Sequence, residues 1–398
     1  MKRLLPVLLL AVPLALFAAT YTPGEIAALR ARAEQGDALA QHNLGVMYEH
    51  GDGVRANRPD AVRWYRLAAE QNLAVAQFNL GAMYASGSGV AQDLAAALLW
   101  WKKAAAQGDP DAQYNLGAMY ASGSGVSKDP AAALEWFRLA AAQGNLAAQK
   151  RLGEMYARGQ GLPPDGAAAI KWWRLAAAQG DATAQFNLGV LYARGEGVPR
   201  DSAAALQWYR QAAGQDFAEA EYSLGLIYAH GEGVPPDPAA AAQWYRKAAE
   251  QDFAEAQADL GLMYARGEGV PQDLAAAMQW YRRAADLGLA RARHNLGVIY
   301  ATGRGVPPDA DEAVKWFRLA AEQGFVPSMY NLGAALLNGG KAGRDPVNAR
   351  AWLEVAGTMG SAQARELLST LDATMTREEI AAAREPARVL REKFALKP

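Results

Sequence analysis

The chain has no cysteine and only 4 histidines among its 398 residues. Without cysteine, the protein can form no disulfide, no thiolate nucleophile and no cysteine-ligated zinc or iron–sulfur site. An excess of charge is also lacking, because 40 basic and 41 acidic residues leave a formal net charge of −1. This balance argues against nucleic acid as a partner, since nucleic-acid binding depends on basic surface.

Long hydrophobic runs are scarce as well. One apolar run, residues 4–17, follows Lys2 and Arg3 and precedes small residues. This order is typical of a secretory signal peptide, which we expect at residues 1–19, with the cleavage position left open. An uncleaved membrane anchor is the alternative, although the run is short for a span of ~20 residues and contains Pro13. The sequence therefore predicts an exported bacterial protein, periplasmic or secreted, with no transmembrane segment after signal removal.

A repeat fills most of the remaining chain. A Leu-Gly pair recurs every 36 residues, with its leucine at Leu44, Leu80, Leu116, Leu152, Leu188, Leu224, Leu260, Leu296 and Leu332. These leucines define copies one to nine. A tryptophan follows each leucine by 20 residues, at Trp64, Trp100, Trp136, Trp172, Trp208, Trp244, Trp280, Trp316 and Trp352. A fixed period of this length indicates a solenoid, in which each unit buries its apolar face against its neighbours.

The first half of each copy predicts a helix that ends at glycine. In the third copy, residues 112–122 form an apolar stripe at helical spacing, which consists of Ala112, Leu116, Met119 and Tyr120. Gly117 lies on the same face, where it lets the partner helix approach closely at a propensity cost of ~1 kcal/mol. Gly123 suits a left-handed C-cap and Gly125 a turn, so neither glycine requires a ligand.

The second half predicts another helix, opened by an N-cap residue. These N-caps are Asn57, Asp93, Asp129, Asp165, Asp201, Asp237, Asp273, Asp309 and Asp345. Small and large residues then alternate, as tight packing requires; in the third copy they are Ala133, Trp136, Phe137, Ala140 and Ala141. Each copy thus predicts one pair of helices.

The combined pattern resembles the Sel1-like repeat family, which is related to the tetratricopeptide repeats. The pattern reads A-x-x-x-L-G-x-M-Y-x-x-G-x-G-V, then D-x-x-x-A-x-x-W-Y/F-x-x-A-A-x-Q-G. The resemblance implies an all-α fold, a right-handed α-solenoid superhelix of nine 36-residue antiparallel helix pairs, with the first helices on the concave side. We expect an N-terminal capping helix in residues 20–36, nine repeats in 37–360 and C-terminal capping helices in 361–398.

No constellation of residues points to catalysis, a metal or a cofactor. His42 and His294 share one repeat position, and His50 and His230 share another, so helix layers spaced ~8–10 Å separate the members of each pair. We interpret all four histidines as surface or groove residues. The glycine loops end helices and lack the lysine of phosphate-binding motifs.

A partner-binding groove is predicted on the face of the first helices that faces away from the apolar stripe. Two residues before the leucine, large aromatic residues recur at Phe78, Tyr114, Phe186, Tyr222 and Tyr330. Six residues after it stand Arg158, Arg194 and Arg266, which could bind carboxylates. One residue before it stand Asn43, Asn79, Asn115, Asn187, Asn295 and Asn331, which could hold the backbone of an extended peptide. Packing between helices remains an alternative for all three sets.

The leading hypothesis is an exported, non-catalytic scaffold or adaptor that binds a protein or peptide in this groove. A secreted branch of the resembling family is linked to penicillin binding and β-lactam hydrolysis, but its repeats carry paired cysteines, which this chain lacks. A structural part of an envelope secretion or polysaccharide assembly is a third hypothesis. The partner and the oligomeric state stay open.

Overall fold

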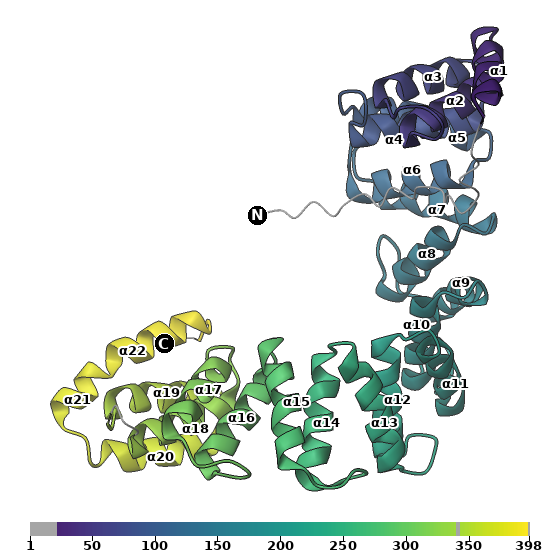
Figure 1. The fold of residues 1–398 in the computed structure, drawn as a ribbon. Coiled ribbons are helices and arrows are strands. Elements are labelled where there is room, and N and C mark those ends of the chain that lie inside the picture. Colours follow the sequence, from purple (N-terminus) through teal and green to yellow (C-terminus); the bar gives the residue numbers. More distant parts are fainter. Residues whose placement is uncertain (1–21, 340–342, 397–398) are drawn as a thin grey trace. The chain divides into compact units, whose positions relative to one another are not determined.

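The computed structural model describes residues 22–339 and 343–396, and the ordered elements in them are α-helices (Figure 1). The helices are α1 (Pro23–Glu34), α2 (Ala38–His50), α3 (Arg58–Glu70), α4 (Ala74–Ser86), α5 (Leu94–Ala106), α6 (Pro110–Ser122), α7 (Pro130–Ala142), α8 (Leu146–Arg158), α9 (Gly166–Ala178), α10 (Ala182–Arg194), α11 (Ser202–Ala213), α12 (Ala218–His230), α13 (Pro238–Glu250), α14 (Ala254–Arg266), α15 (Leu274–Asp286), α16 (Ala290–Thr302), α17 (Ala310–Ala321), α18 (Val326–Asn338), α19 (Pro346–Thr358), α20 (Ala362–Asp372), α21 (Arg377–Ala382) and α22 (Arg384–Lys393).

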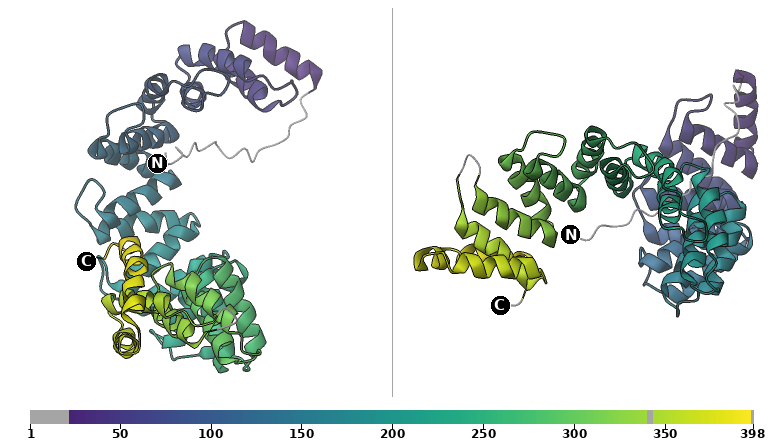
Figure 2. Two further views of the ribbon diagram at one scale, coloured as in Figure 1. Left: turned by 90° about the vertical axis from the view of Figure 1, so that its left-hand side faces the viewer. Right: turned by 90° about the horizontal axis from the view of Figure 1, so that it is seen from below.

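The fold is an α-solenoid, as the repeat predicts. The chain divides into two compact units, residues 1–201 and 202–398. Within each unit, the two helices of a copy pack against each other, and each copy packs against the next (Figures 1 and 2). The even-numbered helices from α2 to α18 are the first helices of the copies, and the odd-numbered helices from α3 to α19 are the second helices.

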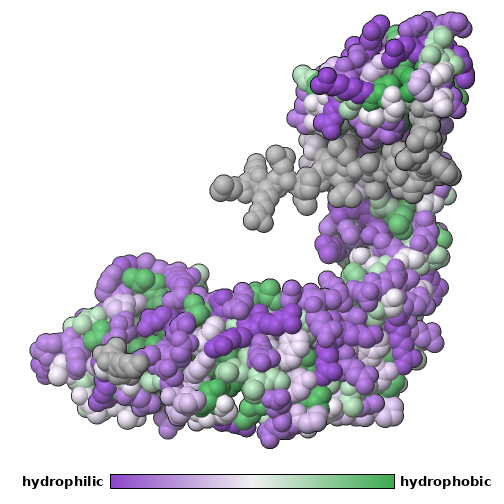
Figure 3. Space-filling view, viewed as in Figure 1, coloured by the Kyte–Doolittle hydropathy of each residue, from purple (hydrophilic) through white to green (hydrophobic). Residues whose placement is uncertain are grey.

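The predicted signal peptide lies outside the described residues. None of the helices in the described part of the chain has the length and apolar content needed to cross a bilayer. On the face seen in Figure 3, polar residues cover most of the coloured surface of each unit, and apolar residues form only small patches.

The helix ends form as the capping residues predict. Side-chain oxygens of the predicted N-caps accept hydrogen bonds from the first turn of the second helices; this bond is present for Asn57, Asp93, Asp129, Asp165, Asp237, Asp273, Asp309 and Asp345. The first helices end at a left-handed glycine, for example Gly123 with φ 78° and ψ 23°. In the ninth copy, Gly339 has φ 69° and ψ 142°, so this helix ends differently.

Contacts between glycine and a ring hold the two helices of a copy together. The glycine of the Leu-Gly pair lies against the side chain that follows the repeated tryptophan. A β-carbon added to Gly117 would lie 2.7 Å from two ring carbons of Phe137, which is 1% exposed. The same contact joins Gly45 to Tyr65, Gly81 to Trp101, Gly153 to Trp173, Gly225 to Tyr245, Gly261 to Tyr281 and Gly297 to Phe317. Only glycine leaves room for the ring at these positions.

We expect Gly117→Ala to destabilise the fold. Alanine gains about 1 kcal/mol of helix propensity, but overpacking a closed core costs about 1–3 kcal/mol, and the buried ring of Phe137 has no room to move. Thermal unfolding followed by circular dichroism would measure a lower melting temperature. Gly24 is the matched control, because nothing lies within 4 Å of an added β-carbon there and Gly24→Ala should not lower stability. Equal melting temperatures for both variants would contradict this account.

Buried carboxamides connect successive copies. Gln113 is 5% exposed and its Nε2 donates to the backbone carbonyl of Ala105 at 3.4 Å, while Gln143 of the same copy donates to Gln113 Oε1 at 2.8 Å. The equivalent position in the sixth copy is Glu221, which is 1% exposed and accepts from Gln251 at 2.7 Å. Burial raises the pKa of the Glu221 carboxyl, and the hydrogen bond from Gln251 and the charge of Lys247 only partly oppose this.

Glu221→Gln should stabilise the protein at neutral pH. A carboxyl whose pKa is raised on folding opposes folding when it is ionised, and this penalty disappears as pH falls through the folded-state pKa. The glutamine can instead donate to a backbone carbonyl as Gln257 does to Ala249 O, at 3.0 Å. The expected gain is ~1–3 kcal/mol at pH 7, as for relief of a buried unsatisfied group, and less at pH 4.

Thermal melting of both chains at the two pH values would measure the gain. Gln257→Glu is the reciprocal control, because it should introduce the same penalty into the seventh copy. An unchanged difference between wild type and Glu221→Gln across pH would contradict the role assigned to this carboxyl.

The C-terminal helices close the second unit. Ser361 caps α20, and Thr376 forms with Glu379 the capping box that its sequence predicts at the start of α21. The chain then continues as α22, which lies beside α19 (Figure 1). Arg391 of α22 donates to Glu354 of α19 at 2.7 Å. The C-terminal helices therefore cover α19, which is the second helix of the ninth copy.

Candidate functional site

The aromatic residues two positions before the leucine pack more closely than the sequence predicts. Phe78 is only 4% exposed and belongs to a core cluster with Trp101. It is therefore a core residue and not a surface for a partner, because the neighbouring copy covers it. The face that we treated as free of packing in fact contacts the second helices.

Other members of this line are half-buried. Tyr114 lies 5.5 Å from Phe137 between ring centroids, and Tyr222 lies 5.6 Å from Tyr245. The Tyr222 hydroxyl also donates to Asp259 at 2.9 Å. Phe186 and Tyr330 are half-buried as well. Tyr114 and Tyr222 therefore pack against the second helices of their own copies, and part of each side chain stays accessible.

The asparagines one position before the leucine occupy different environments. Asn43 is exposed, Asn79, Asn187, Asn295 and Asn331 are half-buried, and Asn115 is 1% exposed. Asn79 Nδ2 lies 3.0 Å from His42 Nε2 of the preceding copy, and His42 Nδ1 lies 3.2 Å from Asn43 Oδ1. Both contacts form when His42 carries its proton on Nδ1, which is consistent with the lowered pKa that burial gives this histidine.

Asn115 lacks such a partner because Phe78 of the preceding copy stands at the position that His42 has in the first copy. Neither its Nδ2 nor its Oδ1 has a hydrogen-bond partner within the described chain. Its carboxamide is thus buried without compensation, and it cannot hold a peptide in the conformation seen.

We expect Asn115→Leu and Asn79→Leu to change stability in opposite directions. Leucine has nearly the shape of asparagine, and at position 115 it removes two unpaired polar atoms whose burial costs ~1–3 kcal/mol. At position 79 it breaks the bond to His42, which should cost ~0.5–1.5 kcal/mol. Differential scanning calorimetry would show the first variant melting above wild type and the second below it. A lower melting temperature for both variants would show that the Asn115 carboxamide is stabilising.

The three arginines of the predicted groove are exposed at the ends of first helices. Arg194 lies 3.6 Å from Glu196, and Arg266 lies 3.5 Å from Glu268, each in the loop that follows its own helix. Arg158 is exposed, and Gln160 stands where the other two loops have glutamate. Each cation is favourably placed at a helix C-terminus, so the set has a structural role before any partner binds.

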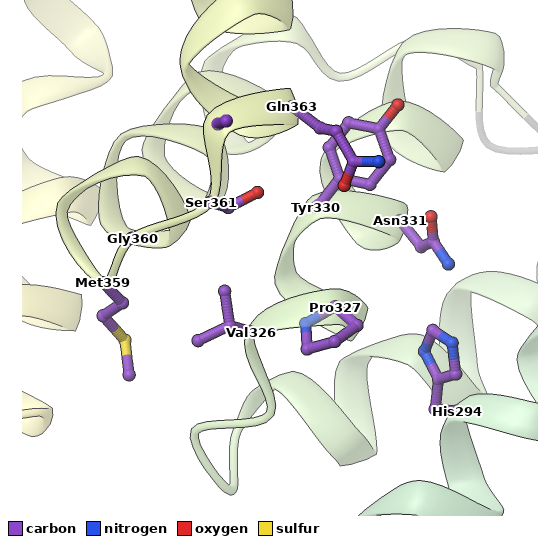
Figure 4. A pocket seen from close by; sticks show the side chains of 10 residues that line it. His294, Val326, Pro327, Tyr330, Asn331, Met359, Gly360, Ser361 and Gln363 are labelled. Atoms are coloured by element: carbon purple, nitrogen blue, oxygen red, sulfur yellow. The ribbon is translucent and has the colours of Figure 1, made fainter.

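A cavity of about 580 Å³ opens between α16, α18 and α20 of the second unit (Figure 4). It is lined by His294, Val326, Pro327, Tyr330, Asn331, Met359, Gly360, Ser361, Ala362 and Gln363. Two of these residues, Tyr330 and Asn331, belong to the groove that the sequence predicts. The remaining lining residues come mainly from the last copy and from α20. The sequence departs from the repeat pattern there, so the pattern did not predict these residues as part of a site.

A histidine and a serine meet beside this cavity. His294 Nδ1 lies 2.8 Å from Ser328 Oγ, and Ser328 replaces the alanine found at this position in the other eight copies. His294 also packs between Phe317 and Phe325, with centroid distances of 5.7 and 5.3 Å. Burial lowers the pKa of His294, which favours the neutral imidazole.

This pair does not form a nucleophilic site. Ser328 is 0% exposed, so a substrate carbonyl cannot reach its oxygen. The residues that line the cavity include no carboxylate that could orient the imidazole. The contact instead fixes the ring of His294 in the cavity wall. Among the described residues, no group of three or more histidine and acidic side chains could hold a metal ion.

Nine consecutive segments between residues 38 and 361 match the Sel1 repeat family, with boundaries every 36 residues. The chain belongs to the Sel1 repeat family. A search of curated proteins finds no match. Among solved structures, the chain is 33% identical to a protective antigen present in uropathogenic Escherichia coli strains, which displays an SLR fold, with a TM-score of 0.63 and coverage of 93% of this chain and 87% of that one.

A second solved structure, a Sel1 repeat protein from Oxalobacter formigenes, is 36% identical. The match has a TM-score of 0.65 and covers 78% of this chain and 90% of that one. Sel1 repeat solenoids are typically used for protein–protein interaction. The family assignment therefore directs attention to surfaces that could contact another protein, among them the first helices and the cavity.

Proposed function

We propose that this Sel1 repeat chain is an exported, non-catalytic scaffold or adaptor that binds a protein or peptide along its first helices. The observation that carries the proposal is the cavity of about 580 Å³ on α16, α18 and α20, whose wall combines the polar side chains of Asn331 and Gln363 with apolar side chains such as Val326 and Met359. Binding sites in proteins are usually hollows of this kind, with mainly apolar walls and a few polar groups that orient the ligand.

Export is supported by the residue order of the first 19 positions and by one relative. The similar Escherichia coli protein is a protective antigen, which supports a location outside the cytoplasm. The exposed members of the predicted groove, Asn43 and the three arginines, add polar surface to other first helices of the chain. We propose that these residues contribute to partner binding at the periphery.

Two alternatives remain as proposals of lower rank. A β-lactamase or penicillin-binding activity would require a reactive group open to solvent, and the histidine–serine pair does not supply one. Hydrolysis of a chromogenic β-lactam by the purified chain would favour this alternative. A structural role in an envelope secretion or polysaccharide assembly would require a second contact surface, which the exposed leucines of α5, α7 and α9 could supply.

Crosslinking in living cells tests the binding proposal. We expect a protein crosslinked to the wild-type chain in the exported fraction to be lost when five first-helix side chains are changed together, namely Asn43, Arg158, Arg194, Arg266 and Tyr330 to alanine. None of the five is deeply buried, so circular dichroism should show full helical content.

The matched control changes Leu99, Leu139 and Leu175 to alanine on the second helices, where their side chains are 54%, 51% and 43% exposed. This control should retain the crosslinked protein. If the control loses the protein and the first-helix variant keeps it, the binding surface lies on the second helices and the structural-assembly alternative is favoured.

A further inference from the structure

The C-terminal helix α22 covers positions of α19 that are exposed in other second helices. We call these the outer positions, one residue before and three residues after the repeated tryptophan. In α19 they are Ala351 and Val355, and both are 0% exposed. In α5, α7 and α9 they include Leu99, Leu139 and Leu175, which are 54%, 51% and 43% exposed. The outer positions of α19 are buried because α21 and α22 pack against this helix (Figure 1).

The contact between α19 and α22 combines apolar packing with an ion pair. Leu390 and Phe394 of α22 pack on the core cluster that contains Val355. Arg391 of α22 donates to Glu354 of α19 at 2.7 Å. Glu354 stands two residues after the tryptophan, where the first eight copies have arginine or lysine. The acidic residue of α19 therefore matches the basic residue that α22 places beside it.

The third and fourth copies have the apolar half of this contact without a covering helix. Leu139 follows Trp136 by three residues, and Leu175 follows Trp172 by three residues, so each leucine lies beside its tryptophan on the helix surface. Both tryptophans are half-buried, whereas Trp352 of α19 is 5% exposed. We call these four residues of α7 and α9 the leucine surface. It exposes apolar area of the kind that α22 covers on α19.

Copies five to seven of the second unit do not repeat this surface. Gln211, Lys247 and Arg283 take the place of the leucine there. The Lys247 ammonium lies 4.5 Å from the ring centroid of Trp244, and the Arg283 guanidinium lies 4.9 Å from that of Trp280. These cations cover part of the ring faces through cation–π contacts. The combination of tryptophan and exposed leucine is thus a local feature of α7 and α9.

Basic residues border the leucine surface. Arg138 and Arg174 are exposed and stand at the position that Glu354 has in α19. Each donates to a tyrosine hydroxyl, a neutral partner that leaves its positive charge in place. Glu135 pairs with Arg138 at 2.7 Å, but Lys171 takes the place of Glu135 in the fourth copy. The border therefore carries an excess of positive charge where α19 carries an acidic residue.

We propose that the leucine surface binds an amphipathic helix of a partner protein, with leucine or phenylalanine on one face and acidic residues at the border of that face. The apolar face packs on Leu139 and Leu175 as α22 packs on α19, and the carboxylates pair with Arg138 and Arg174. The inference goes beyond the proposed function, because it assigns a second partner to the second helices and leaves the first helices to theirs.

Fluorescence anisotropy of two labelled peptides with the full chain tests the inference. Both peptides have the sequence of residues 383–396, which contains α22, and one of them, the acidic peptide, carries Arg384→Glu and Arg391→Glu. The two changes are seven residues apart, so they lie on one side of the helix. We expect the acidic peptide to bind with an apparent Kd at least about tenfold lower than that of the unchanged peptide, and to bind more weakly as salt is raised.

Two double variants of the full chain locate the bound peptide. Leu139→Ala with Leu175→Ala should weaken the acidic peptide by about tenfold or more, because both apolar contacts are shortened. Arg138→Glu with Arg174→Glu should reverse the preference and favour the unchanged peptide. Gln211→Ala, at the same repeat position in the fifth copy, is the matched control and should leave the titration unchanged. These side chains are all exposed, so circular dichroism should show full helical content.

The inference is overturned if the acidic peptide binds no more tightly than the unchanged peptide, or if the leucine variant binds it as wild type does. Tighter binding of the unchanged peptide to the wild-type chain would also overturn it, and would identify α22 of a second copy of this chain as the occupant. The crosslinking of a partner to the first helices depends on none of these results, so the proposed function is tested separately.

Discussion

The contact between a helix glycine and a buried ring sets the geometry on which the rest of the array depends. A β-carbon at Gly153 would lie 2.2 Å from the Trp173 indole nitrogen, so the two helices of that copy are closer than any other residue would permit. Close approach buries these alanines of the second helix almost completely, as for Ala176 and Ala177 at 0% and 6% exposure. It also presents the remaining faces of both helices to the neighbouring copies. The Leu-Gly pair and the tryptophan with its following aromatic residue therefore determine the shape of one copy and the way it packs against the next.

The two residues before each leucine lie beside this contact and pack against more than one helix. A side chain one or two residues before the leucine reaches both the second helix of its own copy and the first helix of the adjacent copy. Where the residues match, as for His42 and Asn79 or for Tyr222 and Asp259, they bond to each other and stabilise the junction. Where they do not match, a polar group can be buried without a partner, as in Asn115. Departures from the repeat therefore change the packing at individual junctions.

The sequence predicts the helices, their caps and the close-packing glycines because these depend on residues near one another in the chain. Asp129 caps α7 through its own first turn, and Gly123 ends α6 through its own backbone angles. The face of a first helix is harder to assign, because a simple division into core and surface assumes one packing partner. In a stack a first helix packs on the second helices of two copies, as α4 does on α3 and α5, and Phe78 is buried among residues of its own and the next copy. The cavity was not predictable, since Met359 and Gln363 lie where the repeat pattern has already changed.

The buried contact between Gln113 and the backbone carbonyl of Ala105 joins two successive copies, and most copies have glutamine at this position. One copy can therefore follow another without any change at the junction, and the identical segments at residues 79–90 and 115–126 are consistent with such a history of duplication. The junction of His294 with Ser328 differs, because its two residues occur together only at the eighth and ninth copies. An insertion of 36 residues would be tolerated within the interior of the array but would separate this pair if it fell between them. The array can thus change in length over evolution while its C-terminal end keeps a fixed composition.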